Sequence, residues 1–381
     1  MRLPRRVARR GILHWVALVA FACLWPWNAK PAEDKKKNKK EEETQTLQLP
    51  AELPNWIVAP THRLTFHVTP LSPRGLLSAQ IREALKNLFH ECSGDTVLQI
   101  RAFVAGSGDV RRVRDLVSEV FTERRQPLPT LCLIRSGGLP VDGAQVVLEA
   151  IAAGRKEVNP HGLAFLSAQM ATSPNPLDPV APLGDQSLAA LGRTVKAAGV
   201  TPDDVLRVTC FVSSLENLTA TRELVARTYP KAAANYVQAQ RGAGRALAAC
   251  EAVAKLESDP ARPLEFRNAV DGASGSDLPA AALVNASELV LTGSQVSFGY
   301  QEQDARLAFE RLRKELEQGG SGLGRVAFAR YYVLSQSIAG QVRKIRTGVF
   351  DAEHRPAGSM LLVEGLPSMD AGFAVDAVAV K

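Results

Sequence analysis

Three stretches of this sequence nearly repeat one another: Leu148-Glu149-Ala150-Ile151-Ala152, Cys250-Glu251-Ala252-Val253-Ala254 and Val375-Asp376-Ala377-Val378-Ala379. Each is a short apolar run, as expected for a buried strand, and each carries one acidic residue at the same place. A recurring acid within a recurring apolar strand indicates that a larger unit has been duplicated.

The same order of elements precedes each stretch. An amphipathic helix comes first, with apolar side chains three and four residues apart, and a strand ending on an aromatic residue and valine follows it. A second helix and two closing strands complete the unit. The first strands are expected at 96–104, 205–212 and 326–333, and the second helices at 110–121, 218–229 and 338–350. The closing strands are expected at 130–135 with 145–152, 235–240 with 246–254, and 359–364 with 373–380.

The repeat divides the chain into three modules, 61–155, 156–257 and 258–381. Modules two and three open with an apolar strand, 163–169 and 289–295, whereas module one offers only an alternating segment at 64–68 and is expected to be truncated at its start. Helices that alternate with strands in this order predict an α+β fold with mixed sheets. A length of 381 residues is consistent with two or three domains.

The first 60 residues read differently from the rest. Residues 1–28 have a basic start with five arginines, an apolar segment and small residues, which is the order of a signal peptide. Residues 29–60 contain a lysine block followed by glutamates and are expected to be a charged flexible linker. The net charge is +7, and without the five leader arginines it falls to about +2, so the charge gives little support to nucleic-acid binding.

The leader predicts a periplasmic or secreted protein with no membrane contact apart from the leader itself. Arg9-Arg10 is similar to a twin-arginine signal, and two alternatives stay open: a leader that remains as a membrane anchor, and a lipoprotein modified at Cys23.

Although export permits disulfides, no C-x-x-C pair occurs and the core is large enough to be stable without disulfide bonds. We therefore predict buried free thiols at Cys92, Cys132, Cys210 and Cys250.

Further motifs resemble those of the RidA family, also called YjgF or endoribonuclease L-PSP. In that family a strand ends in Ser-Gly-Gln, a later segment reads Pro-Ala-Arg-Ser-x-Val-x-Val-x-x-Leu-Pro, and a last strand ends in Glu-Ala-Ile-Ala. The resemblance covers nearly everything from residue 62 onward. The matching segments are 356–367 with 376–379 in module three, 129–140 with 149–152 in module one, and 167–169 with 251–254 in module two.

The resemblance implies a chorismate-mutase-like trimer in which β-sheets line a barrel and ligand clefts lie between adjacent subunits. Three RidA-type modules in one chain would form an intrachain pseudo-trimer with inward-facing sheets. Linking the modules makes their assembly intramolecular, so we expect a monomer.

The resemblance also implies a reaction, the hydrolysis of 2-imino acids to 2-keto acids and ammonia. An arginine holds the substrate carboxylate through paired charge-assisted bonds, and the terminal glutamate places water on the imine carbon. The acids are kept as Glu149, Glu251 and Asp376, which are the candidate catalytic residues. The arginine is replaced in all three modules, by Leu131, by Ala234 (or Asn235 if the alignment slips) and by Gly358.

Candidate ligand-binding residues lie at strand ends. Exposed strand-end arginines and hydrogen-bonding turn residues are the plainer interpretation of all of them, just as each acid is equally consistent with a purely structural carboxylate. The candidates are Arg135, Arg241, Ser167, Gln169, Ser294 and Gln295.

Three hypotheses about function follow. The chain has lost imine hydrolysis and binds a small ligand, with a carboxylic acid as a possible one, or serves as an interaction module. Alternatively it is a 2-iminobutanoate/2-iminopropanoate deaminase-like hydrolase with a rebuilt carboxylate site, or it resembles the chorismatases, which also fuse such modules. No cofactor, metal or nucleic-acid partner is expected, because the sequence lacks the corresponding motifs.

Overall fold

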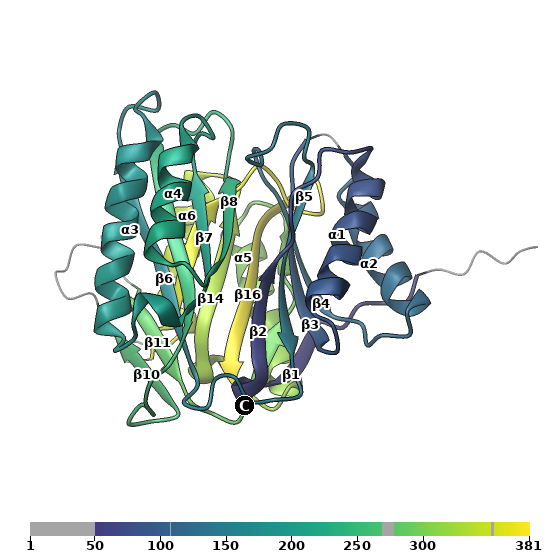
Figure 1. Cartoon of the computed structure of the whole chain (residues 1–381), viewed down its shortest axis with the longest axis vertical. Helices are drawn as coiled ribbons and strands as arrows, with labels where there is room; N and C mark the ends of the chain where they lie inside the picture. Colours follow the sequence, from purple (N-terminus) through teal and green to yellow (C-terminus); the bar gives the residue numbers. More distant parts are fainter. Residues whose placement is uncertain (1–49, 107, 269–277, 352–353) are drawn as a thin grey trace, which may run out of the picture. The chain divides into compact units, whose positions relative to one another are not determined.

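The computed structural model describes residues 50–106, 108–268, 278–351 and 354–381. The predicted leader, 1–28, and most of the predicted linker lie outside these residues. Within the described chain, no helix combines the length and the apolar character that a membrane span requires. Residues from Leu49 onward form one compact unit, in which the strands lie together and helix pairs lie outside them (Figure 1).

Module one forms a four-stranded sheet with two covering helices. The strand order is β2-β5-β3-β4, in which β3 and β4 run parallel and the other pairs are antiparallel. The elements are β2 (Leu64–Val68), α1 (Leu77–Glu91), β3 (Thr96–Val104), α2 (Arg111–Glu123), β4 (Thr130–Arg135) and β5 (Val146–Ala153).

Module two has the same core order in a six-stranded sheet, β10-β11-β6-β9-β7-β8. Two of these strands, β10 and β11, come from the part of the sequence assigned to module three. The elements are β6 (Leu163–Ser173), α3 (Val180–Ala197), β7 (Val205–Val212), α4 (Leu218–Thr228), β8 (Ala233–Gln238), β9 (Ala246–Lys255), β10 (Leu264–Arg267) and β11 (Ala281–Val284).

Module three forms the third sheet, in the order β1-β12-β16-β14-β15, with β13 also paired to β16. Its elements are β12 (Glu288–Thr292), β13 (Gln295–Phe298), α5 (Glu302–Gln318), β14 (Val326–Val333), α6 (Gln336–Val349), β15 (Ala357–Leu362) and β16 (Ala371–Val380). The added strand is β1 (Trp56–Pro60), and single 3-10 turns lie at Thr61–Arg63, Pro202–Asp204 and Leu323–Arg325.

The predicted strands 96–104, 205–212 and 326–333 are confirmed residue for residue as β3, β7 and β14. Each is an apolar run between two helices, so its ends are well marked. The closing strands have less distinct borders in the sequence, and β15 begins and ends two residues before the predicted 359–364. Strand β1 lies within 29–60, the range assigned to the linker.

Each first helix buries one face on its own sheet. In α1 the buried residues include Leu77, Ile81 and Leu88, whose spacing places them on one side of the helix.

Glycines with positive φ follow α3 and α5: Gly199 has φ +72° and Gly320 has φ +82°. A residue with a β-carbon is strained in that conformation, so glycine marks these helix ends.

Chain segments before a module cross to the sheet of another module. Strand β1 precedes module one but pairs with β12, and β11 precedes the opening strand of module three but pairs with β6. These added strands satisfy the edge N–H and C=O groups of the sheets they join, which would otherwise be open to pairing with other chains. Separating module one together with β1 from the rest of the unit would therefore expose an edge of the third sheet.

The three sheets pack on one another through the faces opposite to their helices. Two apolar clusters fill this interior, and each draws residues from all three sheets. Phe103, Phe211 and Tyr332 belong to one cluster, and they are the aromatic residues of the repeated aromatic-valine ending. Side chains two residues apart on a strand share a face, so residues 101, 209 and 330 face the same interior.

The prediction of four free thiols is wrong for two of them. Cys210 and Cys250 form a disulfide, while Cys92 and Cys132 are free and buried. Cys210 and Cys250 are directly opposite each other on the antiparallel β7–β9 ladder. Their pairing depends on strand register, which spacing along the chain does not reveal.

The disulfide predicts a stability difference that reductant reveals. Replacing Cys210 and Cys250 together by alanine should lower the unfolding free energy by about 3 to 4 kcal/mol, since the bond closes a loop with a sequence separation of 40 residues in the unfolded chain. Urea unfolding with and without dithiothreitol measures this. Reductant should not change the midpoint of the double variant, and an equal shift in both proteins would contradict the assignment.

Candidate functional site

A layer of buried charged side chains lies between the two interior apolar clusters. It contains three arginines and three acids, so its formal charge is zero. Every member is at most 3% exposed, whereas charged side chains are almost never fully buried unless they are paired. The charged members are Arg101, Arg207, Arg330, Glu149, Glu251 and Asp376.

Strand register brings these groups together. Arg101 is opposite Glu149 on the β3–β5 ladder, and Arg330 is opposite Asp376 on the β14–β16 ladder. In module two the residue opposite Glu251 is Thr209, so this module lacks the arginine of its own pair. The three inner faces therefore present the same acid but only two arginines at the matching position.

Arg101 bridges two modules. Its Nη2 lies 2.5 Å from Glu149 Oε2 and 2.7 Å from Glu251 Oε1, and its Nε donates to Glu149 at 2.9 Å. The guanidinium also lies 5.1 Å from the centre of the Phe103 ring. Thus the cation that Glu251 lacks within module two is supplied by module one.

Glu149 is the most fully paired acid of the layer. Its Oε1 accepts hydrogen bonds from Thr209 Oγ1 and Asn235 Nδ2, each at 2.7 Å, and both donors belong to module two. Arg207, two residues before Thr209, adds an ion pair at 3.4 Å. The strong pairing of Glu149 offsets the large free-energy cost of burying its charge.

The other two acids are paired through module three. Ser359 Oγ donates to Glu251, and Arg330 lies 2.8 Å from Asp376 Oδ1 and 3.5 Å from Glu251 Oε1. Asp376 Oδ2 is buried without a hydrogen-bond partner in the described structure. Asp376 is therefore the least compensated acid, held by one close contact.

The pKa values follow this pairing. Burial alone would raise the pKa of Glu149, but Arg101, Arg207 and the two hydrogen bonds outweigh it and lower the pKa to about 2. Arg101 and Arg330 likewise overcome burial and lower the pKa of Glu251. Burial lowers the pKa of Arg207 to about 10, since repulsion by Arg101 and Arg330 counteracts the attraction of Glu149.

The structure brings the three predicted catalytic acids into one layer but gives none of them access to solvent. Glu149 is 1% exposed, Glu251 2% and Asp376 0%. Arg101, Arg207 and Arg330 are the members of the layer that the sequence analysis missed. The available signal was a charged residue inside an otherwise apolar strand, which recurs in all three modules.

The predicted ligand-binding residues are spread over several places. Ser167 Oγ donates to Pro279 O at 2.5 Å and accepts from Gly358 N at 2.8 Å, while Gln169 Nε2 donates to the carbonyl of Ser167. The bond from Gly358 N connects β15 of the third sheet to β6, where pairing with β9 shifts register between Leu166 and Gln169. Ser167 and Gln169 are each 4% exposed, so these bonds join neighbouring strands rather than form a solvent-facing site.

Ser294 and Gln295 lie at the corresponding break between β12 and β13. Ser294 N donates to the carbonyl of Leu131 at 3.3 Å, and Gln295 begins β13 and is 7% exposed. Both residues therefore lie against neighbouring strands, and neither contacts the charged layer in the described structure.

The two predicted arginines bind carbonyl groups at the end of the strands. Arg135 Nη2 donates to Gly106 O at 3.0 Å, and Arg241 Nε donates to Gly137 O at 2.5 Å. Neither forms an ion pair with an acid of the buried layer among the described residues. They do not stand in for the arginine of the RidA family.

The positions that match the family arginine offer no side-chain cation. A β-carbon on Gly358 would lie 2.2 Å from the backbone oxygen of Ala329, so no side chain fits there. Leu131 and Ala234 are partly buried and pack on the cores of their own modules.

Within the described residues, no group of His, Cys, Asp and Glu side chains is arranged to hold a metal ion.

Known structures with a similar fold cover about one module of this chain. Rv2704 from Mycobacterium tuberculosis, a member of the YjgF/YER057c/UK114 family, is 22% identical over 31% of this chain and 99% of its own, with a TM-score of 0.24. NMB1025 from Neisseria meningitidis, a YjgF protein, is 16% identical over 31% and 94%, with a TM-score of 0.24. YyfB of the Rid family from Yersinia pestis is 15% identical over 32% and 100%, with a TM-score of 0.29.

No protein-family model and no curated protein matches this chain. The similar structures named here belong to the YjgF and Rid families, whose motifs the sequence resembles. The class defined by the described residues themselves is a mixed α+β protein of three sheets with covering helices.

The buried layer predicts a charge-balance effect. Arg101→Met should lower the unfolding free energy by about 3–5 kcal/mol, because it leaves Glu149 and Glu251 short of a cation in the interior. Adding Glu251→Gln restores equal numbers of charges, so the double variant should be more stable than Arg101→Met alone. Urea unfolding of both variants provides the measurement, and a double variant less stable than the single one would refute the charge-balance explanation.

The low pKa of Glu149 predicts acid sensitivity. Its folded-state pKa is about 2 against an ordinary value of 4.5, so its stabilising contribution is complete above pH 4.5 and is lost as the pH falls toward 2. The loss should amount to about 3 kcal/mol. Unfolding free energies between pH 7 and pH 2 test this, with Glu149→Gln as the control that lacks the titrating group; identical pH profiles for the two proteins would be inconsistent with this role.

Proposed function

We propose that this chain is an exported, non-catalytic protein of three RidA-like modules that binds a small ligand or serves as an interaction module. The buried charged layer is the observation that carries the proposal. The residues that match the catalytic acids of the family are used here to join the three sheets.

The layer leaves no room for the expected reaction. A general acid or base acts only within hydrogen-bond reach of its substrate or of a water that attacks it. Glu149 is already bonded to Arg101, Thr209 and Asn235, and it has almost no exposed surface. Breaking these bonds to admit a substrate would leave arginines unpaired in the interior, which costs several kcal/mol (about 3–5).

Substrate capture is affected as well. The hydrolysis of an imino acid needs a cation that holds the carboxylate next to the reacting carbon. Gly358 has no space for a side chain, and the arginines of the interior are already engaged with acids of the chain. The candidate cations Arg135 and Arg241 lie at the strand ends instead.

We infer that the modules form an intrachain pseudo-trimer. Contacts in a cyclic order support this: β2 lies against β8, β6 against β15, and β12 against β4. Each opening strand thus packs on the fourth core strand of the next module. Covalent linkage gives such an arrangement a high effective concentration and makes a monomer the expected state.

Export rests on the leader and on the disulfide. The leader lies outside the described residues, but a disulfide between Cys210 and Cys250 is typical of proteins folded in an oxidising compartment. Both features favour a periplasmic or secreted location.

The proposal predicts no imine hydrolysis by the purified mature chain. With 2-iminopropanoate generated in place, ammonia release should equal the buffer rate, and Glu251→Ala should not change it. Light scattering should give the mass of one chain and circular dichroism a folded protein. Turnover that disappears in Glu251→Ala would overturn the proposal in favour of a RidA-type hydrolase.

A further inference from the structure

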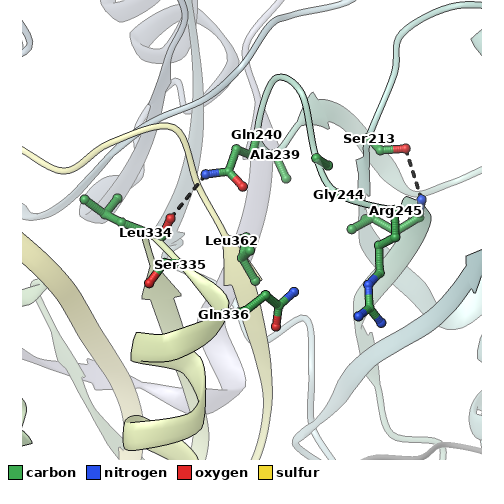
Figure 2. A pocket seen from close by; sticks show the side chains of 11 residues that line it. Ser213, Ala239, Gln240, Gly244, Arg245, Leu334, Ser335, Gln336 and Leu362 are labelled. Carbon is green, nitrogen blue, oxygen red and sulfur yellow. Dashed lines mark hydrogen bonds between the residues drawn. The ribbon is translucent and has the colours of Figure 1, made fainter. Parts of the chain in front are cut away.

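A cavity of about 360 Å³ lies between the second and third modules, away from the charged layer. One wall comes from Ser213 after β7, from Gln240 after β8 and from the segment 243–247. The other comes from Leu334–Gln336, at the start of α6, and from Leu362 at the end of β15 (Figure 2). About 300–1,000 Å³ is the usual range for cavities that bind small molecules.

Module three departs from the other two modules at a residue that lines the cavity. Leu362 is in parallel register with Val333, as Arg135 is with Val104 and Gln238 with Val212. These three side chains therefore occupy corresponding positions. Arg135 and Gln238 fold back onto the carbonyls of Gly106 and Ser213, at 3.0 and 2.9 Å. A leucine has no donor and cannot make this contact.

In module three the carbonyl that corresponds to that of Ser213 belongs to Leu334. It accepts a hydrogen bond from module two instead of from Leu362. Gln240 Nε2 donates to Leu334 O at 3.2 Å and lies 3.4 Å from Val363 O. This bond holds the two walls together at one end and fixes the spacing between them. The cavity is thus a feature of the module junction rather than a loose surface groove.

The lining has the composition of a site for an anion with an apolar body. Among the described residues that line it, Arg245 is the only charged one; its side chain is exposed and forms no hydrogen bond or ion pair with another described residue. Gln336 lies on the opposite wall in Figure 2. The apolar part is formed by Leu247, Leu334 and Leu362.

The surrounding backbone adds to the positive potential. Helix α6 begins at the cavity, with Ser335 Oγ accepting from Ile338 N at its N-terminus. Helix N-termini favour negative charge, with an effect that is modest alone but has the same sign as that of Arg245. No acidic residue is among those that line the cavity.

We propose that this cavity binds a small organic acid, with its carboxylate on Arg245 and a short branched aliphatic body against the three leucines. The inference depends on the proposed function only in assuming that the chain binds a ligand without converting it. The site differs from the family cleft, because Leu362 is four residues along β15 from Gly358, a distance of about 13 Å.

The test is titration calorimetry of the mature chain with 4-methylpentanoate and with the neutral 4-methylpentanamide. The acid should bind saturably and the amide at least roughly tenfold more weakly, since a charge-assisted bond to a guanidinium is lost. Inorganic phosphate, which lacks the apolar body, should also bind more weakly. Equal affinity for acid and amide, or no saturable binding of the acid, would overturn the proposal.

Two variants locate the site. Arg245→Gln should weaken binding of the acid at least roughly tenfold, whereas Arg245→Lys should retain part of the affinity and Arg262→Gln, an exposed arginine elsewhere, should match the wild type. Leu362→Gln, which copies module two, should close the cavity and abolish binding. Wild-type affinity in both Arg245→Gln and Leu362→Gln would refute the site.

The outcome is separable from that of the imine assay. Turnover of 2-iminopropanoate together with Arg245-dependent binding of 4-methylpentanoate would overturn the proposed function and support this site. Absence of both would overturn this site and leave the non-catalytic interpretation in place.

Discussion

The packing of the three sheets depends on the pairing of Arg101 with Glu149 and Glu251. A guanidinium in an apolar interior is tolerated only when carboxylates and hydrogen bonds replace its water. Arg101 finds one acid on its own sheet and the other on the sheet of module two. The same contact that neutralises the cation therefore fixes how two modules lie against each other.

The remaining charges extend this constraint to the whole interior. Asn235 and Thr209 of module two bind an acid of module one, and Ser359 of module three binds an acid of module two. Apolar contacts above and below are non-directional and would tolerate small shifts between the sheets. Hydrogen bonds with defined geometry permit fewer arrangements, so the polar layer gives the interior its register.

Because the three modules lie in one chain, each can differ at a position that corresponds to one in the other two. In an assembly of identical chains a substitution at residue 209 would appear three times, whereas here Thr209 stands opposite Glu251 once and is compensated by Arg101. Leu362 is a second case, since Arg135 and Gln238 hold the corresponding positions. Such differences give each junction between modules its own lining residues.

The sequence by itself determined where β3, β7 and β14 lie, since they are apolar runs bounded by helices and their periodicity is local. It also indicated the acids that recur at one strand position. Only the tertiary structure decided what these acids contact: Arg101 and Glu251 are 150 residues apart. Strand register and packing between sheets bring them together, and neither leaves a signal at fixed spacing. The Cys210–Cys250 bond, the pairing of β1 with β12 and the cavity at Leu362 also depend on contacts between residues far apart in the sequence. Local motifs therefore indicated the fold, whereas only long-range contacts formed the candidate sites.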